Sequence, residues 1–302
     1  MDHTRKASTA RLTRRDVLRH TSLLAAGASL TLPGCSDLHN PQSRSPLRIG
    51  LVTDVHYADK PAAGSRDYRE SLDKLSSAVA RFNEAQTDFV VELGDFIDDA
   101  LTVEEELGYL RRIESVFAQA CCPRHHVLGN HCVYSLTKEQ CLAVFNASRS
   151  CYSFDRAGFH FIILDACFRQ DGEPYGNKNF KWTDSDIPPA QIEWLTADLR
   201  ATSYPTVVFV HQRLDVQNDY GIKSQAEVRQ CLETSGKVLA VFQGHYHRND
   251  LKEINGIHYC TLAAMVERDG NAYGLMTLHP NGSIHLEGYG QQSSEKLASS
   301  RA

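Results

Sequence analysis

The sequence lacks the features that several protein classes require. None of its 9 cysteines forms a CxxC pair, so a zinc ribbon or a thioredoxin-type redox motif is excluded. No run of Lys or Arg occurs after the first 35 residues, and we therefore expect no nucleic-acid partner. No apolar stretch reaches the roughly 20 residues that a helix needs to span a bilayer. There is also no internal repeat.

What remains is the composition of an ordinary globular protein. The chain has 302 residues, of which 42% are hydrophobic and 23% are charged, enough for one sizeable domain or two small ones. Residues 1–35 carry six Lys or Arg and two Asp, so the net charge of −5 for the chain becomes −9 for the remainder. Eight cysteines follow Cys35, and we expect most of them to be small core residues rather than disulfide partners.

The first 35 residues are typical of an export signal. Arg14 and Arg15 precede a short apolar run over 21–32, a pattern that resembles a twin-arginine signal peptide. The segment ends in LPGC, which resembles the lipobox of lipoproteins, so that Cys35 becomes either an acylated N-terminus or part of a simple cleavage site. We expect a partner in the twin-arginine export machinery, a periplasmic or membrane-anchored protein, and membrane contact only through that lipid. Residues 36–46 are polar and are predicted to be a linker.

The remaining residues alternate between strand and helix patterns. Strands are predicted over 47–53, 88–93, 125–128, 152–154, 159–164, 206–210 and 238–242, and helices over 68–84, 103–120, 138–145 and 189–199. A meander of short strands follows residue 256. The pattern predicts one α/β domain over 47–290 whose core is two packed sheets rather than a single doubly wound sheet, followed by a flexible tail over 291–302.

Metal-ligating residue types follow five of these strands. They are found in DVH (54–56), GDFID (94–98), GNH (129–131), the single His211, and GHYH (244–247). Each residue alone has an ordinary interpretation, because Asp often caps a helix and His is often a surface residue. Together they form a set of oxygen and imidazole ligands with no thiolate, which suits Zn, Mn or Fe in a binuclear site. The glycines at these strand ends are expected to permit tight turns.

The order of these blocks resembles that of the calcineurin-like metallophosphoesterases, D-x-H, G-D-x-x-D, G-N-H-[DE], H and G-H-x-H, over residues 47–289. The resemblance implies a four-layer fold, a two-sheet β sandwich flanked by helices. It implies that Asp54, His56, Asp95 and His247 hold one divalent metal and that Asp95, Asn130, His211 and His245 hold the other, with Asp95 bridging. Two ions about 3.5–4 Å apart activate a hydroxide and hold the phosphoryl oxygens in such sites.

The same resemblance gives His131 a catalytic role. It would contact the phosphoryl group, stabilising its charge or protonating the leaving oxygen, with Asp98 as its orienting partner. The acid that follows GNH in the family is replaced here by Cys132. We expect Cys132 to be a small buried thiol, with a catalytic or metal role as the alternative.

Several stretches resemble one branch of that family, the manganese-dependent ADP-ribose/CDP-alcohol diphosphatases. They are TDVHYAD, GSRDYRESL, ELGDFIDD, YSFDRAGFHFIILDA and GIHYCTLAAMVE. The resemblance favours Mn and hydrolysis of a diphosphate bond in a nucleotide-type substrate such as ADP-ribose or a CDP-alcohol. The alternatives are an exported phosphodiesterase or phosphomonoesterase of broad specificity, and a metal-binding scaffold without catalysis.

Six further residues are candidates for substrate contacts. Tyr57 would stack on a base or ribose, or pack under the site. Arg66 and Arg69 would bind an anion at a helix start, or remain solvated surface residues. The long connection over 169–186 carries Tyr175, Lys178 and Trp182 and is either a lid over the site or a cover on the sheet.

Overall fold

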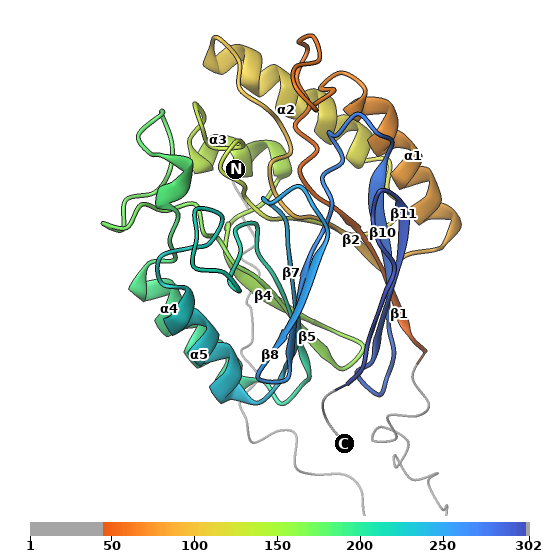
Figure 1. Ribbon diagram of the computed structural model, residues 1–302, viewed down its shortest axis with the longest axis vertical. Helices are drawn as coiled ribbons and strands as arrows, with labels where there is room; N and C mark the ends of the chain where they lie inside the picture. Colours follow the sequence, from red (N-terminus) through yellow and green to blue (C-terminus); the bar gives the residue numbers. More distant parts are fainter. Residues whose placement is uncertain (1–44, 300–302) are drawn as a thin grey trace, which may run out of the picture. The chain divides into compact units, whose positions relative to one another are not determined.

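The computed structural model describes residues 45–299, which form two stacked six-stranded sheets with helices on both outer faces (Figure 1). The predicted signal peptide and Cys35 lie outside the described residues. The four-layer fold predicted from the sequence is confirmed. Among the residues described, no helix is long and apolar enough to cross a bilayer.

The first sheet has the strand order β12-β11-β10-β1-β2-β3, and the second has β4-β5-β6-β7-β9-β8. The strands of the first sheet are β12 (Glu295–Leu297), β11 (Ile284–Gly290), β10 (Ala272–Leu278), β1 (Leu47–Val52), β2 (Phe89–Glu92) and β3 (Arg124–His126). Those of the second are β4 (Tyr152–Arg156), β5 (Phe159–Ile163), β6 (Thr206–Phe209), β7 (Val238–Gln243), β9 (Ile257–Thr261) and β8 (Asp250–Ile254). The chain therefore returns to the first sheet after β9.

Three apolar layers hold these elements together. Residues such as Leu51, Phe89 and Phe209 fill the space between the sheets, where the rings of Phe89 and Phe161 meet edge to face with centroids 5.0 Å apart. The helices α1 (Ser71–Glu84), α2 (Val103–Phe117) and α3 (Lys138–Phe145) cover the first sheet, and α4 (Pro189–Ala201) and α5 (Gln225–Ser235) cover the second. Because both faces of β1 and β2 are covered, these strands are apolar nearly throughout.

Local sequence signals set the helix starts. Thr102 accepts a hydrogen bond from the Glu105 amide while the Glu105 side chain accepts one from the Thr102 amide, and Thr137 and Gln140 repeat this capping box at α3. Pro189 occupies the first turn of α4, where its missing N–H costs nothing. These signals explain why the predicted helix starts at 103, 138 and 189 agree with the structure.

The structure departs from the sequence prediction at three elements. The pattern does not predict α5 or β8, and it assigns residues 291–302 to a flexible tail, whereas residues 295–297 form β12 and pair with β11. Leu297 is buried between the sheets, which gives this short strand its anchor. The tail prediction is therefore wrong for these residues.

The eight cysteines in the described part of the chain are all free. Cys132, Cys141, Cys167 and Cys260 are buried, and three others pack partly buried against the core, which agrees with the expectation of small core residues. Only Cys121 is exposed.

Candidate metal centre and its cleft

The predicted ligands come from loops that follow parallel strands. β1, β2 and β3 run parallel in the first sheet, as do β5, β6, β7 and β9 in the second. Their carboxyl ends carry the loops 53–58, 93–99, 129–132, 210–213 and 244–249, which meet at one edge of the sandwich. The structure thus brings all seven predicted ligands into one region, four from the first sheet and three from the second.

Backbone hydrogen bonds join these loops directly. The Asp54 amide donates to Gly94 O at 3.0 Å, and the His56 amide donates to Asp95 O at 2.8 Å. From the second sheet, the Gly244 amide donates to His211 O at 3.0 Å. These hydrogen bonds therefore fix the positions of the ligand loops relative to one another.

Many of the ligands also have an unfavourable backbone conformation. Five of the seven have φ between 44° and 69°, in the left-handed region that costs non-glycine residues about 1–3 kcal/mol each: Asp54, His56, Asp95, His245 and His247. Such strain persists only where surrounding contacts over-determine it, and it concentrates at functional sites.

Two glycines at the strand ends make room for ligand groups. A Cβ on Gly129 would overlap the Asp95 amide nitrogen and Oδ1, and a Cβ on Gly244 would overlap Thr53 Oγ1 and come within 2.6 Å of Asp54 Oδ2. Neither glycine has a positive φ. The expectation that they permit turns is thus corrected for these two, which instead let the backbone approach the carboxylates closely.

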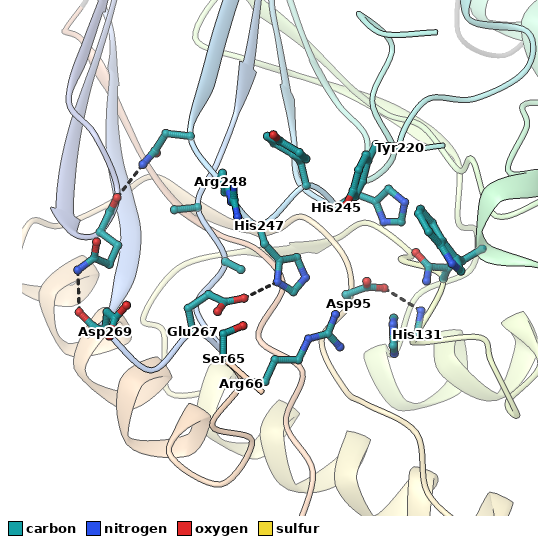
Figure 2. A pocket seen from close by; sticks show the side chains of 17 residues that line it. Ser65, Arg66, Asp95, His131, Tyr220, His245, His247, Arg248, Glu267 and Asp269 are labelled. Atoms are coloured by element: carbon teal, nitrogen blue, oxygen red, sulfur yellow. Dashed lines mark hydrogen bonds and ion pairs between the residues drawn. The ribbon is translucent and has the colours of Figure 1, made fainter. Parts of the chain in front are cut away.

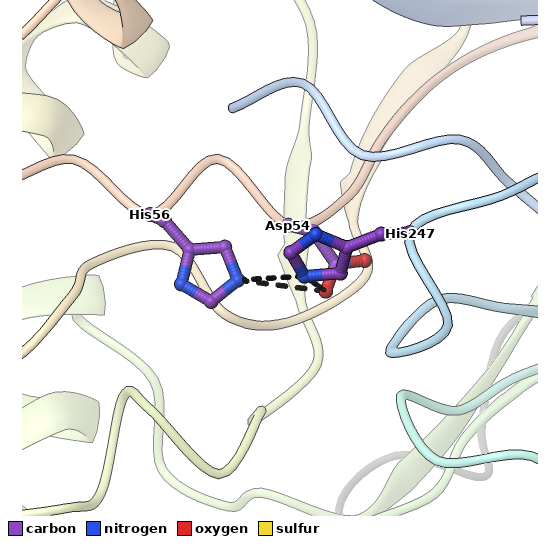
Figure 3. Close-up of side chains that lie close together, drawn as sticks. All are labelled: Asp54, His56 and His247. Carbon is purple, nitrogen blue, oxygen red and sulfur yellow. Dashed lines mark hydrogen bonds and ion pairs between the residues drawn. The ribbon is translucent and has the colours of Figure 1, made fainter. Parts of the chain in front are cut away.

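The first cluster consists of Asp54, His56 and His247 (Figure 3). Nε2 of His56 and Nε2 of His247 lie 3.2 Å apart. Asp54 Oδ1 lies 3.3 Å from His247 Nε2 and 3.7 Å from His56 Nε2. Burial opposes ionisation of Asp54, but His247 and His56 more than offset it and hold the pKa of this carboxyl well below its usual range.

The second cluster consists of Asp95, His211 and His245. Asp95 Oδ2 lies 3.1 Å from His211 Nε2 and 3.6 Å from His56 Nε2, so this carboxylate stands between the two clusters. Burial would raise the pKa of Asp95, but neighbouring imidazoles, led by His211, lower it. Asn130, which follows β3, lines the same cleft.

The hydrogen bonds of the imidazoles show which nitrogens are free to bind a cation. His211 Nδ1 lies 2.9 Å from Leu93 O, which can only accept, so Nδ1 carries a proton and Nε2 faces Asp95 Oδ2 at 3.1 Å. His247 Nδ1 likewise lies 2.8 Å from Glu267 Oε1, which leaves Nε2 facing Asp54. In each cluster, an imidazole Nε2 therefore faces a carboxylate oxygen across 3.1–3.3 Å, a place that a proton or a metal cation between the two atoms would stabilise.

Buried polar atoms without partners indicate the same positions. Fourteen buried side-chain nitrogen and oxygen atoms of the described residues have no hydrogen-bond partner, and four of them are Asp54 Oδ1, Asn130 Oδ1, His211 Nε2 and His245 Nε2. Unpaired buried polar atoms are rare because each one costs about 1–3 kcal/mol. All four belong to the predicted ligand set, and their nitrogen and oxygen chemistry fits Mn, Fe or Zn.

Asp98 lies nearer to His56 than to His131. Its Oδ2 lies 3.6 Å from His131 Nδ1, beyond hydrogen-bond distance, but 3.1 Å from His56 Nδ1. It also accepts hydrogen bonds from Lys60 at 2.7 Å and Arg66 at 3.0 Å. Asp98 therefore orients the His56 ring, pairs with two cations and lies within ion-pair distance of His131, so its role as the orienting partner of His131 stays a prediction.

His131 lies at the mouth of the cleft. Its backbone amide donates to Asp95 Oδ1 at 2.8 Å, and its ring packs edge-on against His56 with centroids 4.5 Å apart. The side chain is 29% exposed, so it can reach a bound phosphoryl group. Burial lowers the pKa of His131 to about 4, against the opposing effect of Asp95 and Asp98.

Cys132 is a structural residue. Its thiol is fully buried and accepts a hydrogen bond from the Phe96 amide at 3.2 Å. Burial raises the pKa of this thiol well above its usual value, so it is neither a thiolate ligand nor a nucleophile. The structure thus favours the first of the two expectations for this residue.

Glu267 is a site residue that the sequence pattern does not reveal. It lies in the loop between β9 and β10 and holds the Nδ1 side of the ligand His247. The histidine hydrogen bond lowers the pKa of Glu267, so the carboxylate is ionised at neutral pH. Such partners fix the ring orientation of metal-binding histidines and raise their basicity.

We expect Glu267→Gln to weaken Mn²⁺ affinity about 10- to 100-fold, because the amide holds the His247 ring less firmly and removes a negative charge behind it. The measurement is a titration of Mn²⁺ against a competing chelator, with kcat recovering at saturating Mn²⁺. Glu253→Gln is a matched control, since Glu253 also lies beside a histidine, His258, but is 59% exposed and outside the cleft. Equal affinity in wild type and Glu267→Gln would contradict the role given to Glu267.

A cleft of about 1050 Å³ opens over the two clusters (Figure 2). Its volume is at the upper end of the about 300–1,000 Å³ typical of small-molecule sites, so it has room on both sides of a metal-bound phosphate. Ser65, Arg66 and Glu267 line one side, and Trp182 and Tyr220 line the other.

Of the six predicted substrate contacts, the structure places only Arg66 and Trp182 on this cleft. Tyr57 is buried and packs edge to face against Tyr109 with ring centroids 5.8 Å apart, so it packs under the site. Arg69 is 57% exposed and pairs with Asp59 at 2.6 Å, as a solvated surface residue does. The assignments of Tyr57 and Arg69 as substrate contacts are corrected.

The segment 169–186 is mainly a cover on the fold. Tyr175 is buried, stacks on Phe180 at 3.6 Å, and donates to Lys181 O. Lys178 lies over the ring of Tyr134 and lines a separate surface hollow. Tyr175 and Lys178 therefore do not contact the cleft, and only Trp182 reaches it.

Behind the ligand loops, a chain of buried ionisable groups leads away from the cleft. Glu92 accepts a hydrogen bond from the Gly94 amide at 2.7 Å, and its other oxygen lies 3.7 Å from His126 Nδ1. His126 Nε2 lies 3.4 Å from Glu114, which pairs with Arg124 at 3.3 Å. Burial raises the pKa of Glu114 to about 7, against the opposing effect of Arg124.

This raised pKa predicts a pH-dependent stability effect. The carboxyl of Glu114 is protonated in both states below about pH 4.5, so it contributes no penalty there, and the folded state loses stability as pH rises from about 4.5 to about 7. Glu114→Gln removes this loss and should be more stable than wild type by about 1–3 kcal/mol at pH 8, but not at pH 4.5. Urea unfolding at the two pH values measures the difference, with Glu193→Gln on an exposed position of α4 as control. An equal gain in the free energy of unfolding of Glu114→Gln at both pH values would contradict the raised pKa of Glu114.

Comparison with known proteins agrees with the site. The sequence model described as calcineurin-like phosphoesterase matches residues 47–249. The chain therefore belongs to the calcineurin-like phosphoesterase family, and the resemblance seen in the motifs is confirmed. With its paired His and Asp clusters, it is a binuclear-metal phosphoesterase.

Individual relatives are distant. A protein of Oryza sativa subsp. japonica named manganese-dependent ADP-ribose/CDP-alcohol diphosphatase is 25% identical over 294 residues, which cover 79% of this chain and 90% of that protein. An Arabidopsis thaliana protein of the same name is 23% identical, over 76% of this chain and 90% of its own. The crystal structure of a dimetal phosphatase from Danio rerio shares the fold with a TM-score of 0.75 at 20% identity, covering 85% of this chain and 100% of that one.

Proposed function

We propose that this enzyme hydrolyses the diphosphate linkage of a nucleotide-type substrate such as ADP-ribose or a CDP-alcohol, with Mn²⁺ as the favoured metal. Two observations support the substrate class. The relatives named above carry this activity in their names, and the cleft is larger than a phosphate monoester requires.

The observation that carries the proposal is the convergence of unpaired ligand atoms on two neighbouring points. We assign one ion to Asp54, His56, Asp95 and His247 and the other to Asp95, Asn130, His211 and His245. Asp95 Oδ2 would be the shared ligand, because it lies near ligand nitrogens of both groups. The ligand side chains carry two carboxylates, so a pair of divalent cations leaves a local positive charge that attracts phosphate into an acidic protein.

When bound, such an ion pair activates a water molecule for attack on phosphorus and neutralises the phosphoryl oxygens. The residues of the chain then position the substrate and its protons. His131 contacts the phosphoryl group from the cleft side, where its backbone is fixed by the Asp95 carboxylate. Arg66 donates from Nη1 to Asp98 at 3.0 Å, and its guanidinium, which points toward Asp95 in Figure 2, has further N–H groups to donate to the phosphate that leaves. The new P–O bond forms as the bridging P–O bond breaks, and the departing phosphate takes up a proton.

A substrate panel tests this function. The purified full-length chain with Mn²⁺ is assayed on ADP-ribose, CDP-choline, cyclic nucleotides, p-nitrophenyl phosphate and bis(p-nitrophenyl) phosphate, with products identified by mass spectrometry. We expect kcat/KM for the two diphosphates to exceed the others at least about tenfold, with AMP and ribose 5-phosphate as the products of ADP-ribose. Equal rates on all, or preference for the simple esters, would instead favour the broad phosphoesterase, and absence of all turnover with no bound metal would favour the scaffold.

For location, we propose export by the twin-arginine route and attachment or release at Cys35. The motif at residues 13–35 supports this proposal. Mass spectrometry of the native N-terminus tests it. An acylated Cys35 is the outcome for a lipoprotein, cleavage near it without a lipid is the outcome for a released protein, and an intact Met1 in the cytoplasm would overturn the proposal.

A further inference from the structure

The side of the cleft next to the second cluster is aromatic. Trp182 is 41% exposed and is the only one of the four large exposed hydrophobic residues in the described chain that lines the cleft. Its ring centroid lies 5.6 Å from that of His245 and 5.5 Å from that of Tyr220. Tyr220 in turn meets Tyr246 edge to face at 5.0 Å. Three aromatic rings thus continue from the ligand His245 toward solvent.

Hydrogen bonds fix the backbone that carries two of these rings. Trp182 begins the short 3₁₀ helix η3 (Trp182–Asp184), and the next residue, Ser185, accepts a hydrogen bond from the Lys223 amide at 3.0 Å. The backbone oxygen of Tyr220 accepts a hydrogen bond at 3.0 Å from the amide of Arg213. Arg213 lies two residues after the ligand His211. A surface that is ordered before the ligand arrives loses little entropy on binding.

The opposite side of the cleft is lined by polar and charged side chains. Ser65, Arg66 and Glu267 line it next to the first cluster, and Figure 2 shows Ser65, Glu267 and Asp269 on the side of His247 away from Tyr220. Gln291 also lines the cleft. Carboxylates and amides of this kind hydrogen-bond sugar hydroxyls and offer no aromatic face. The cleft therefore has one end suited to a flat ring and one end suited to a polyol.

We propose that Trp182 and Tyr220 form a stacking platform for the nucleobase, so that the nucleoside half of the substrate lies over the second cluster and the sugar or alcohol half lies toward Arg66 and Glu267. This rests on the proposed function and adds the orientation of the substrate and the residues that select a nucleotide. Neither Tyr220 nor this orientation follows from the metal motifs. Stacking of a base on an aromatic side chain is sequence-tolerant, which accommodates both adenine and cytosine.

The competing explanation is that Trp182 only shields His245 from water. A shield affects every substrate equally, whereas a base platform affects only substrates that carry a base. We therefore compare ADP-ribose with dimethyl diphosphate, which has the same P–O–P bond and no ring. Trp182→Ala should lower kcat/KM for ADP-ribose about 5- to 100-fold and leave that for dimethyl diphosphate within about twofold.

Two variants serve as controls in this comparison. Trp182→Phe should recover most of the ADP-ribose activity because it keeps an aromatic face. Tyr204→Ala removes an aromatic residue that is 38% exposed and outside the cleft, and it should change neither substrate. An equal loss on both substrates in Trp182→Ala would overturn the platform and favour the shield.

Tryptophan fluorescence tests binding without turnover. The chain has only two tryptophans, so Trp194→Phe on α4 leaves Trp182 as the single emitter. With Mn²⁺ present throughout, AMP should change the emission in a saturable way, and ribose 5-phosphate, which carries the same phosphate and no base, should not. Equal responses to both, or none to AMP, would overturn the inference.

The two assays separate this inference from the proposed function. Hydrolysis of ADP-ribose with no selective effect at Trp182 would leave the function standing and remove the platform. A base-specific fluorescence change without diphosphate hydrolysis would keep the platform and remove the function.

Discussion

Replacement of Asp95 by Asn is expected to lower kcat/KM of the Mn²⁺-loaded enzyme by at least about 10³-fold. Asp95 Oδ2 lies between the two ligand clusters, 3.1 Å from His211 Nε2 and 3.6 Å from His56 Nε2. A neutral amide cannot bridge two cations, and loss of one ion removes several kcal/mol of charge stabilisation, each 1.36 kcal/mol being about tenfold in rate. Elemental analysis should show fewer than two bound ions per chain.

The substitution should leave the fold intact. The amide oxygen of Asn can still accept the hydrogen bond that the His131 amide donates to Asp95 Oδ1 at 2.8 Å. Asp155→Asn provides the matched control, since Asp155 is 54% exposed on β4 and outside the cleft. Full activity or two bound ions in Asp95→Asn would show that this carboxylate is not the shared ligand.

His131→Ala is expected to give the second large effect. It should lower kcat about 10²- to 10⁴-fold. His131 reaches the cleft without belonging to either proposed ligand set, so metal content should stay at two ions, which separates this variant from Asp95→Asn. His285→Ala on β11 replaces a histidine of the first sheet far from the ligand loops in sequence and should retain activity.

The loss of kcat in His131→Ala, measured on substrates with different leaving groups, shows which role His131 has in the reaction. If it protonates the leaving oxygen, the loss should be largest for alkyl esters and small for p-nitrophenyl esters, whose leaving group needs no proton. If it only stabilises phosphoryl charge, the loss should be similar for both. Loss of metal together with activity would mean that His131 acts through the ligand cluster instead.

The metal ligands could be predicted because each one lies two to four residues after the end of a strand. In parallel strands the carboxyl ends share one edge of the sheet, so DVH, GDFID and GNH come together once β1, β2 and β3 are recognised. The motif order supplied the rest of the set, and the structure brings His211 and His245 to the same place from the second sheet.

Partners of the ligands could not be predicted in the same way. Asp98 belongs to the GDFID block and His131 to the GNH block, and only the fold shows that the Asp98 carboxylate lies nearer to His56 Nδ1, at 3.1 Å, than to His131 Nδ1, at 3.6 Å. Glu267 lies 20 residues beyond His247 in the sequence, and their contact depends on how the chain crosses from β9 back to the first sheet. Such contacts follow from tertiary geometry, which no local pattern encodes.

The fold elements that were not predicted share weak apolar signals. Only Gln225, Val228 and Leu232 of α5 are buried, and β8 is an edge strand with no fully buried residue. Edge strands bury little surface and therefore carry little hydrophobic periodicity. The same limit applies to substrate contacts, since Tyr57 and Tyr175 are aromatic in sequence but buried in the fold.

The central claim is that two cations sit side by side on these loops. Anomalous diffraction from crystals of the full-length chain grown with Mn²⁺ tests it most directly. We predict two Mn²⁺ peaks about 3.5–4 Å apart, one bonded to Asp54, His56 and His247, the other to Asn130, His211 and His245, with Asp95 touching both. A single peak, or two peaks without Asp95 between them, would contradict this account.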